Sequence, residues 1–194
     1  MNTHLKLPIA TLLQKGFVKS INSRVADCLK ATLFAIHPMN HHFRIALFHP
    51  EIPQNTGNIV RTCRATNTPL TLIKPLGFQI NDRQVKRAGL DYWDEVQIET
   101  IDRPQFETMI NQINQPVYFF TSKTSRSFWD VDYTKGATLV FGSETKGLPE
   151  EYYKLYETQL VTIPMAAGAR CLNLSNSVAI ALYEALRVTH KKGN

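Results

Sequence analysis

Residues 163–180 have the sequence Ile163-Pro164-Met165-Ala166-Ala167-Gly168-Ala169-Arg170-Cys171-Leu172-Asn173-Leu174-Ser175-Asn176-Ser177-Val178-Ala179-Ile180. The residues just before them, 159–163, are β-branched and apolar, which is typical of a strand that ends at Pro164. From Leu174 onward, apolar residues recur at helical spacing over a wide surface, which predicts a long helix buried on two sides. The small residues between these elements favour a loop whose backbone approaches a ligand, although a loop that merely connects strand and helix has the same composition.

Upstream of this stretch, short apolar runs alternate with helical segments. Strands are predicted near residues 43–48, 70–74, 117–121, 138–142 and 159–163, and helices near 56–67, 81–88, 103–113, 149–156 and 174–190. Near-continuous apolar strands in such an alternation are typical of an α/β fold with a mostly parallel sheet and helices on both faces. Ligands of these sheets bind at the carboxyl ends of the strands.

The composition is typical of a soluble globular protein. Hydrophobic residues make up 43% of the chain, and no apolar run approaches the roughly 20 residues needed to cross a bilayer. The three cysteines are widely spaced and form no Cys-x-x-Cys pair. This argues against a disulfide framework and a metal site, and for a reducing, cytoplasmic location.

The first 42 residues differ from the rest of the chain. They contain five Lys and Arg residues and one Asp, so four of the six net positive charges lie there. The net charge favours a polyanionic partner, but most of it lies outside the regular βα pattern. We expect residues 1–42 to be an appendage, either flexible or extended from an upstream start codon with Met39 as the alternative start. Residues 43–194 are expected to form the functional domain.

A second loop follows the strand predicted near 138–142. Its sequence is Phe141-Gly142-Ser143-Glu144-Thr145-Lys146-Gly147-Leu148-Pro149. Its two glycines allow tight turns and close approach of the backbone to a ligand. Leu and Pro follow Gly147 where a nucleoside triphosphate loop requires Lys and Ser or Thr, and the chain has no Gly-x-Gly-x-x-Gly. A nicotinamide or ATP enzyme is therefore disfavoured.

A third segment lies just after the first predicted strand. It reads Glu51-Ile52-Pro53-Gln54-Asn55-Thr56-Gly57-Asn58-Ile59-Val60-Arg61, and Asn55 or Thr56 is a natural helix N-cap. Arg61 and Arg64 then share one helix face, either as contacts to phosphate or ribose or as solvated surface arginines. Further on, residues 82–93 combine basic and aromatic side chains, which suits single-stranded RNA.

Taken in order, residues 55–61, 141–147 and 163–175 closely resemble the three motifs of the SPOUT-class RNA methyltransferases. Residues 50–58 and the run Arg87-Ala88-Gly89-Leu90-Asp91-Tyr92 make the chain similar to the TrmL/YibK family, over about residues 43–190. The resemblance implies S-adenosylmethionine-dependent 2′-O-methylation of the wobble cytidine or uridine, nucleotide 34, in tRNA-Leu. The implied partner is the tRNA anticodon stem-loop.

The resemblance also implies a C-terminal trefoil knot, a homodimer, no metal, and S-adenosylmethionine bound by three loops of the knot. The implied cofactor contacts are Phe120, Gly142, Ile163 and Cys171. Catalytic roles fall to Arg61 and Asn173, with Asn173 and Glu144 orienting the loops. The implied substrate contacts are Asn55, Arg61, Arg64, Arg87 and Tyr92.

Two positions depart from the family pattern. Cys171 stands where Ser is usual, and Trp93 stands where His is common. Cysteine is a weaker hydrogen-bond partner than serine, so cofactor binding suffers if this position acts through its side chain. Two alternatives therefore remain: a 2′-O-methyltransferase for another RNA such as rRNA, and a catalytically weak knotted protein that binds RNA.

Overall fold

The computed structural model describes residues 41–79, 93 and 95–191. Within these residues, six strands form one sheet in which every neighbouring pair is parallel. The strands are β1 (Phe43–Phe48), β2 (Leu70–Ile73), β3 (Ile98–Ile101), β4 (Val117–Phe120), β5 (Ala137–Phe141) and β6 (Leu160–Val161). Their order across the sheet is β3-β2-β1-β5-β4-β6.

Strand β1 lies near the centre of the sheet. Its Ile45 pairs with Leu70 of β2 on one side and with Leu139 of β5 on the other. All residues of β2, β4 and β5 are buried. These strands are apolar along most of their length because both faces of the sheet are covered by other elements.

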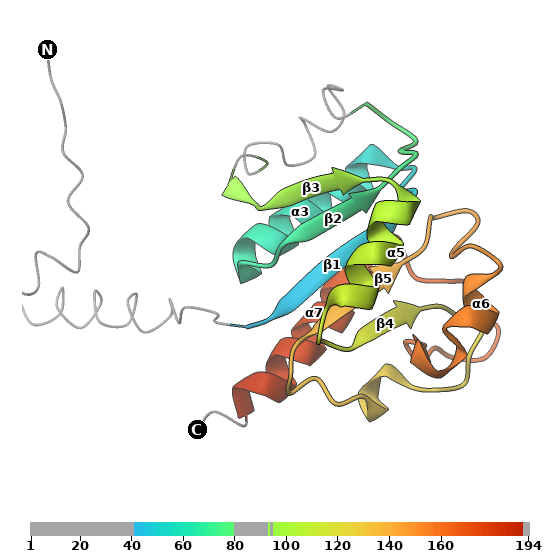
Figure 1. Ribbon diagram of the computed structural model, residues 1–194. Coiled ribbons are helices and arrows are strands. Elements are labelled where there is room, and N and C mark those ends of the chain that lie inside the picture. Colours follow the sequence, from blue (N-terminus) through green and yellow to red (C-terminus); the bar gives the residue numbers. More distant parts are fainter. Residues whose placement is uncertain (1–40, 80–92, 94, 192–194) are drawn as a thin grey trace, which may run out of the picture. The chain divides into compact units, whose positions relative to one another are not determined.

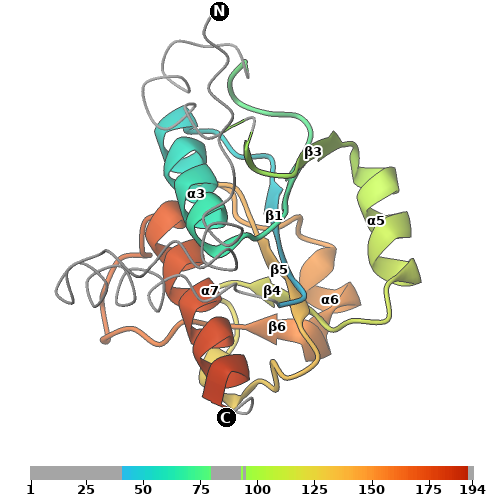
Figure 2. The same ribbon diagram turned by 90° about the vertical axis from the view of Figure 1, so that its left-hand side faces the viewer.

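Among the described residues, four α-helices cover the sheet. Helices α3 (Pro53–Thr66) and α7 (Leu174–Lys191) lie on one face, and α5 (Arg103–Gln112) and the short α6 (Tyr152–Leu155) lie on the other (Figures 1 and 2). Helix α7 packs against α3 and β5. Two 3₁₀ turns, η3 (Phe128–Asp130) and η4 (Glu157–Gln159), belong to the connections that precede β5 and β6.

Aromatic side chains fill the core between the sheet and α5 and α6. The Phe48 ring meets the rings of Phe106 and Tyr152 edge to face, with centroids 5.6 and 5.2 Å apart. Phe119 meets Tyr152 in the same manner at 5.7 Å. Such pairs contribute about 0.5–1.5 kcal/mol each beyond the burial of their area, so this cluster anchors both helices to the sheet.

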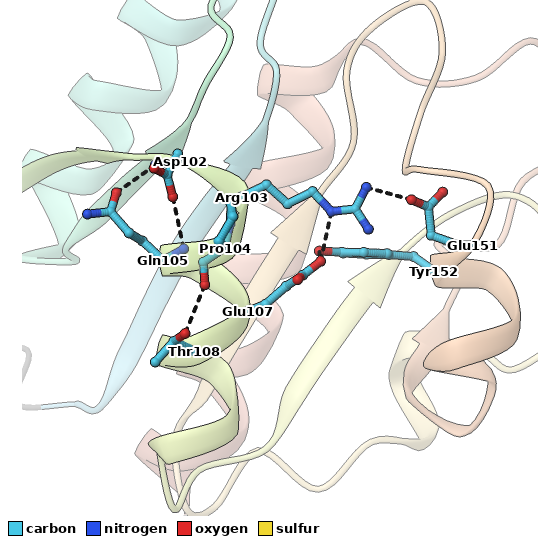
Figure 3. Close-up of polar contacts among 8 residues, drawn as sticks. All are labelled: Asp102, Arg103, Pro104, Gln105, Glu107, Thr108, Glu151 and Tyr152. Carbon is cyan, nitrogen blue, oxygen red and sulfur yellow. Dashed lines mark hydrogen bonds and ion pairs between the residues drawn. The ribbon is translucent and has the colours of Figure 1, made fainter.

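Arg103, the first residue of α5, ties that helix to α6 (Figure 3). Its guanidinium donates hydrogen bonds to Glu107 at 2.7 Å and to Glu151 at 2.5 Å, and it lies 5.0 Å from the centroid of the Tyr152 ring. The Tyr152 hydroxyl donates to the same Glu107 carboxylate at 2.8 Å. Hydrogen bonds from Arg103 and then Tyr152 hold the pKa of Glu107 below its usual value.

The predicted α/β architecture is confirmed, with two differences. Strand β3 was not predicted, because Ile98-Glu99-Thr100-Ile101 is a half-buried edge strand with polar residues at its centre. Helix α3 begins at Pro53 rather than near residue 56, and Ile52 occupies its N-cap position. The prediction of Asn55 or Thr56 as the N-cap is therefore wrong.

Several predictions lie outside the described residues. These are the helix near 81–88 and nearly all of the appendage, residues 1–42. The boundary between the appendage and the domain stays a prediction, as does the trefoil knot.

None of the helices in the described part of the chain combines the length and the hydropathy needed to cross a lipid bilayer.

The sheet order brings four loops together. Strands β1, β5, β4 and β6 are consecutive neighbours in a parallel sheet, so the loops that leave their carboxyl ends emerge at one edge. Two of the motifs lie in or begin in these loops, and the first, residues 55–61, lies in the first half of α3, directly after the loop that leaves β1. The fold thus places the motifs where parallel α/β sheets bind their ligands.

Candidate active site

A cavity of about 430 Å³ lies at this edge of the sheet. Its walls come from residues 121–123 after β4, residues 142–148 after β5, and residues from 162 to 173 after β6. Ile52 and Asn55 add a fourth side from the start of α3. All four predicted cofactor residues, Phe120, Gly142, Ile163 and Cys171, line this cavity.

Two buried aromatic residues adjoin the cavity. The rings of Phe120 and Phe141, at the ends of β4 and β5, are stacked with centroids 4.6 Å apart and planes 15° apart. Leu148, Ile163 and Leu172 add further apolar lining. A lining that mixes apolar side chains with a few polar groups is usual for a small-molecule site.

The loop after β5 folds back on itself. The backbone of Ser143 exchanges two hydrogen bonds of 3.0 Å with the backbone of Gly147. Gly147 has a φ of +71°, and a Cβ atom on Gly142 would lie 2.1 Å from the carbonyl carbon of Gly147. Both positions therefore require glycine, which explains the spacing of the two glycines in this motif.

Glu144 sits inside this folded loop and binds the start of α3. Its carboxylate accepts hydrogen bonds from the backbone N–H groups of Glu51 at 2.8 Å and Ile52 at 3.2 Å. It also accepts one from the Asn55 side chain at 2.9 Å. The N-cap residue of α3 makes no side-chain capping hydrogen bond, so Glu144 supplies the negative charge that a helix N-terminus favours.

A reciprocal contact strengthens the same junction. The Glu51 carboxylate accepts hydrogen bonds from the backbone N–H of Thr145 at 3.2 Å and from its hydroxyl at 2.8 Å. The loop after β1 and the loop after β5 thus each supply a carboxylate to the other. This role of Glu51 was not predicted from the sequence.

Asn173 joins the start of α7 to this network. Its Nδ2 donates to Asn55 Oδ1 at 2.8 Å, while its own Oδ1 accepts from the backbone N–H and hydroxyl of Ser175 at 2.9 and 2.7 Å. The chain of contacts from Glu144 through Asn55 to Asn173 fixes the N-termini of α3 and α7 beside the cavity. The Asn55 amide is occupied on both sides by this bridge.

The two described cysteines have opposite environments. Cys171 is exposed at the cavity, and its Sγ lies 3.8 Å from the Ser122 hydroxyl oxygen. Cys63 is buried in α3, and burial raises the pKa of its thiol to about 12. Cys63 is consequently unreactive at neutral pH, whereas Cys171 touches the candidate ligand site.

The structure does not bring all of the predicted substrate residues together at the main cavity. Arg61 is exposed on α3 and makes no hydrogen bond or ion pair with any described residue. Arg64 pairs with Glu95 at 2.6 Å and lines a separate polar cavity of about 350 Å³ near the amino ends of the strands. Neither arginine is among the described residues that line the main cavity. Arg87 and Tyr92 lie outside the described residues.

Sequence reasoning missed two residues of the cavity wall, Lys123 and Tyr153. Lys123 lies three residues after the end of β4. Its position just beyond the carboxyl end of a strand is the sequence feature that could have identified it. Tyr153 lies on α6, and only the folded chain brings this helix to the cavity. Among the described residues, no group of three or more His, Cys, Asp or Glu side chains is arranged to hold a metal ion.

Comparisons with known proteins agree with this geometry. The sequence model of the SpoU rRNA Methylase family matches residues 42–183. The tRNA (cytidine(34)-2'-O)-methyltransferase of Methylovorus glucosotrophus is 43% identical over 147 residues, which cover 75% of this chain and 94% of that protein.

Two solved structures are also similar. One, described as giving structural insights into the 2-OH methylation of C/U34 on tRNA, matches with a TM-score of 0.71 and 38% identity over 80% of this chain and 99% of that chain. The other is an AdoMet-bound rRNA methyltransferase from Sinorhizobium meliloti, with a TM-score of 0.69 and 27% identity over 80% of this chain and 59% of that chain. The resemblance to the SPOUT-class methyltransferases is thereby confirmed. The chain belongs to the SpoU rRNA Methylase family.

Proposed function

We propose that the protein uses S-adenosylmethionine to methylate the ribose 2′-hydroxyl of nucleotide 34, the wobble cytidine or uridine, of tRNA. The observation that carries the proposal is the single cavity where the three motif loops meet and which all four expected cofactor residues line. The activity named for the relative from Methylovorus glucosotrophus supports the choice of substrate. Among tRNAs, we propose tRNA-Leu and its anticodon stem-loop as the target.

The cavity fits the cofactor in size and chemistry. Its volume falls within the range of about 300–1,000 Å³ that is usual for small-molecule sites. The folded loop between Gly142 and Gly147 leaves no room for a Cβ atom at Gly142, and both glycines line the cavity. Leu148, Ile163 and Leu172 give the lining an apolar part that suits a purine.

The proposed reaction does not require a side chain that acts as a strong general base. The bound cofactor would supply an electrophilic methyl group on a sulfonium. Attack by the 2′-hydroxyl oxygen on this methyl group forms the O–C bond, breaks the S–C bond, and releases a neutral thioether and the hydroxyl proton, which passes to water. The described cavity lining contains no His or Asp, and Glu144 is committed to three hydrogen bonds. We therefore assign catalysis mainly to alignment, which supplies about 7–11 kcal/mol. The bridge from Glu144 through Asn55 to Asn173 holds the loops that do the aligning.

In this proposal, Arg61 acts at the cavity of a second copy of the chain. Its side chain lies on the outer surface of α3, away from the cavity of its own protomer. On the neighbouring helix α7, Ile180 and Tyr183 are 42% and 53% exposed and share one outer stripe. We propose that these surfaces pack in a homodimer and that Arg61 reaches the RNA phosphate or ribose across the interface.

The roles of the other predicted substrate residues form part of the same proposal. Asn55 acts at the substrate side through its bridge to Asn173, and Arg87 and Tyr92 contact the tRNA around the target nucleotide. Arg64 lies near the amino ends of the strands, so we propose that it contacts the tRNA farther from that nucleotide. The compartment is proposed to be the cytoplasm, where tRNA is modified.

Mass spectrometry of nucleosides from bulk tRNA tests the function directly. Deletion of the gene is expected to remove 2′-O-methylated cytidine or uridine from position 34, and expression of the intact chain is expected to restore it. Unchanged tRNA would overturn the proposal. Loss of a ribose methylation from rRNA instead would assign the enzyme to the other RNA class.

A further inference from the structure

The charged side chains on the described wall of the cavity are Glu144, Lys123 and Lys146. Both oxygens of Glu144 are engaged by the start of α3, so its charge is directed to that helix. Of the two lysines, Lys123 has its ammonium over the ring of another residue of the lining, Tyr153. Lys123 is thus the cation that another residue of the cavity wall holds in place.

Two neighbours hold Lys123 in place. Its Nζ lies 4.0 Å from the centroid of the Tyr153 ring, which itself lines the cavity, and 3.1 Å from Glu150 Oε2. Its backbone N–H donates to the Thr121 hydroxyl at 3.1 Å, which fixes the turn after β4. The Tyr153 hydroxyl lies beside Gly147, where a Cβ atom would be 3.2 Å from it.

The ion pair with Glu150 is easily exchanged. The side chain of Lys123 is 55% exposed and that of Glu150 is 84% exposed. Pairs this exposed contribute little because water screens them and both long side chains lose freedom. The cation–π contact with Tyr153 is compatible with a different anion on the free side of the ammonium.

We propose that Lys123 binds the carboxylate of the cofactor's amino-acid moiety, exchanging Glu150 for it while the ammonium stays over the Tyr153 ring. The inference rests on the proposed function, which supplies a ligand with one anionic group. That carboxylate is the only anion on S-adenosylmethionine, and a cation on the wall of its cavity has no other negative partner in the ligand. An RNA phosphate would instead meet Lys123 from outside the cavity.

Calorimetry with two ligands tests the assignment on the full chain. S-Adenosylhomocysteine carries the carboxylate, and 5′-methylthioadenosine has the same nucleoside and sulfur without the amino-acid moiety. The Lys123→Met change is expected to weaken S-adenosylhomocysteine binding about fivefold and to leave 5′-methylthioadenosine binding unchanged. Because 5′-methylthioadenosine binding reports an intact cavity, it separates this loss from misfolding.

Two further variants sharpen the test. Lys154→Met removes an exposed cation of α6 that is not part of the described cavity lining, and it is expected to change neither affinity. Glu150→Gln removes the competing carboxylate and is expected to tighten S-adenosylhomocysteine binding about twofold.

The inference is overturned if Lys123→Met weakens both ligands equally or neither, or if Lys146→Met produces the ligand-selective loss instead. A raised KM for tRNA with unchanged S-adenosylhomocysteine binding would also overturn it and make Lys123 an RNA contact. If the wild-type chain binds neither nucleoside, the cofactor assignment in the proposed function fails along with the inference. Normal binding with no effect of Lys123→Met defeats the inference alone.

Discussion

The side chain of Asn173 donates a 2.8 Å hydrogen bond to the side chain of Asn55, 118 positions earlier in the sequence. This contact joins the first turn of α3 to the residue that precedes α7. The Asn55 side chain also donates a hydrogen bond to Glu144, so this one buried amide links three segments around the cavity. The three motifs are therefore held together directly, and not only through the sheet beneath them.

Replacement of Asn55 by Ala should disturb both stability and catalysis. Asn55 is 5% exposed, and its removal deprives Asn173 and Glu144 of one hydrogen-bond partner each. The expected loss is about 1–3 kcal/mol in the free energy of unfolding, measured by urea denaturation. Asn58→Ala is the matched control, because Asn58 is exposed on the same helix. Equal, small losses in the two variants would contradict the bridging role.

The two glycines with the most different surroundings should respond differently to alanine. A Cβ atom on Gly142 would lie 2.1 Å from backbone, so Gly142→Ala must displace the folded loop and cost about 3 kcal/mol or more. Gly168 has open space within 4 Å but a φ of +76°, so Gly168→Ala should cost about 1–2 kcal/mol from backbone strain alone. Thermal unfolding and cofactor calorimetry measure both. The opposite order of losses would show that the loop after β5 is more adaptable than its contacts indicate.

The Arg103 cluster should make stability depend on pH in the acid range. The pKa of Glu107 is lower in the folded chain than the value of about 4.3 for a free side chain, because Arg103 and Tyr152 donate to its carboxylate. Its contribution is therefore present at neutral pH and is lost as pH falls through the lower, folded-state pKa.

The Arg103→Met change tests this contribution. Both partners are about one-third exposed, so screening limits the expected loss to about 1 kcal/mol at pH 7. The difference from wild type should shrink as pH falls below the usual carboxyl value of about 4.3 and through the lower, folded-state pKa of Glu107. Urea unfolding at several pH values measures this, with Lys154→Met as a control of equal charge change. A difference that does not vary with pH would mean that Arg103 acts through packing alone.

Much of the fold could be predicted because the buried strands are recognisable from their apolar sequences. Strands β1, β4 and β5 are apolar almost throughout, which in a βα alternation indicates a covered parallel sheet. Strand β3 carries no such signature. Its Glu99 is placed by hydrogen bonds from Arg44 and Thr71, on two other strands, and such partners cannot be inferred from local sequence.

The parts of the site that depend on local backbone geometry could be predicted from the sequence. The parts that depend on contacts between side chains far apart in the sequence could not. Gly142 and Gly147 indicate a tight loop from their spacing alone, and the structure confirms why each must be glycine. Asn55 was assigned as an N-cap because a short polar side chain before a helix usually serves that purpose. Its actual partners, Glu144 and Asn173, lie 89 and 118 positions away, so only the sheet order reveals its function as a bridge.

Arg61 should separate cofactor binding from methyl transfer. It is exposed on α3 and is not part of the described cavity lining of its own protomer, so Arg61→Ala should leave S-adenosylhomocysteine affinity nearly unchanged. If it stabilises charge on the RNA across the dimer interface, single-turnover methylation of tRNA should slow by about 100-fold. Lys135→Ala, at another exposed cation, provides the control.

Mixing Arg61→Ala chains with chains that carry Gly142→Ala should then restore activity at one of the two sites. In each mixed dimer, the intact cavity of the Arg61→Ala chain faces the intact Arg61 of the Gly142→Ala chain. Equal loss of binding and methylation in Arg61→Ala, or no rescue in dimers shown to be mixed, would exclude action across the interface.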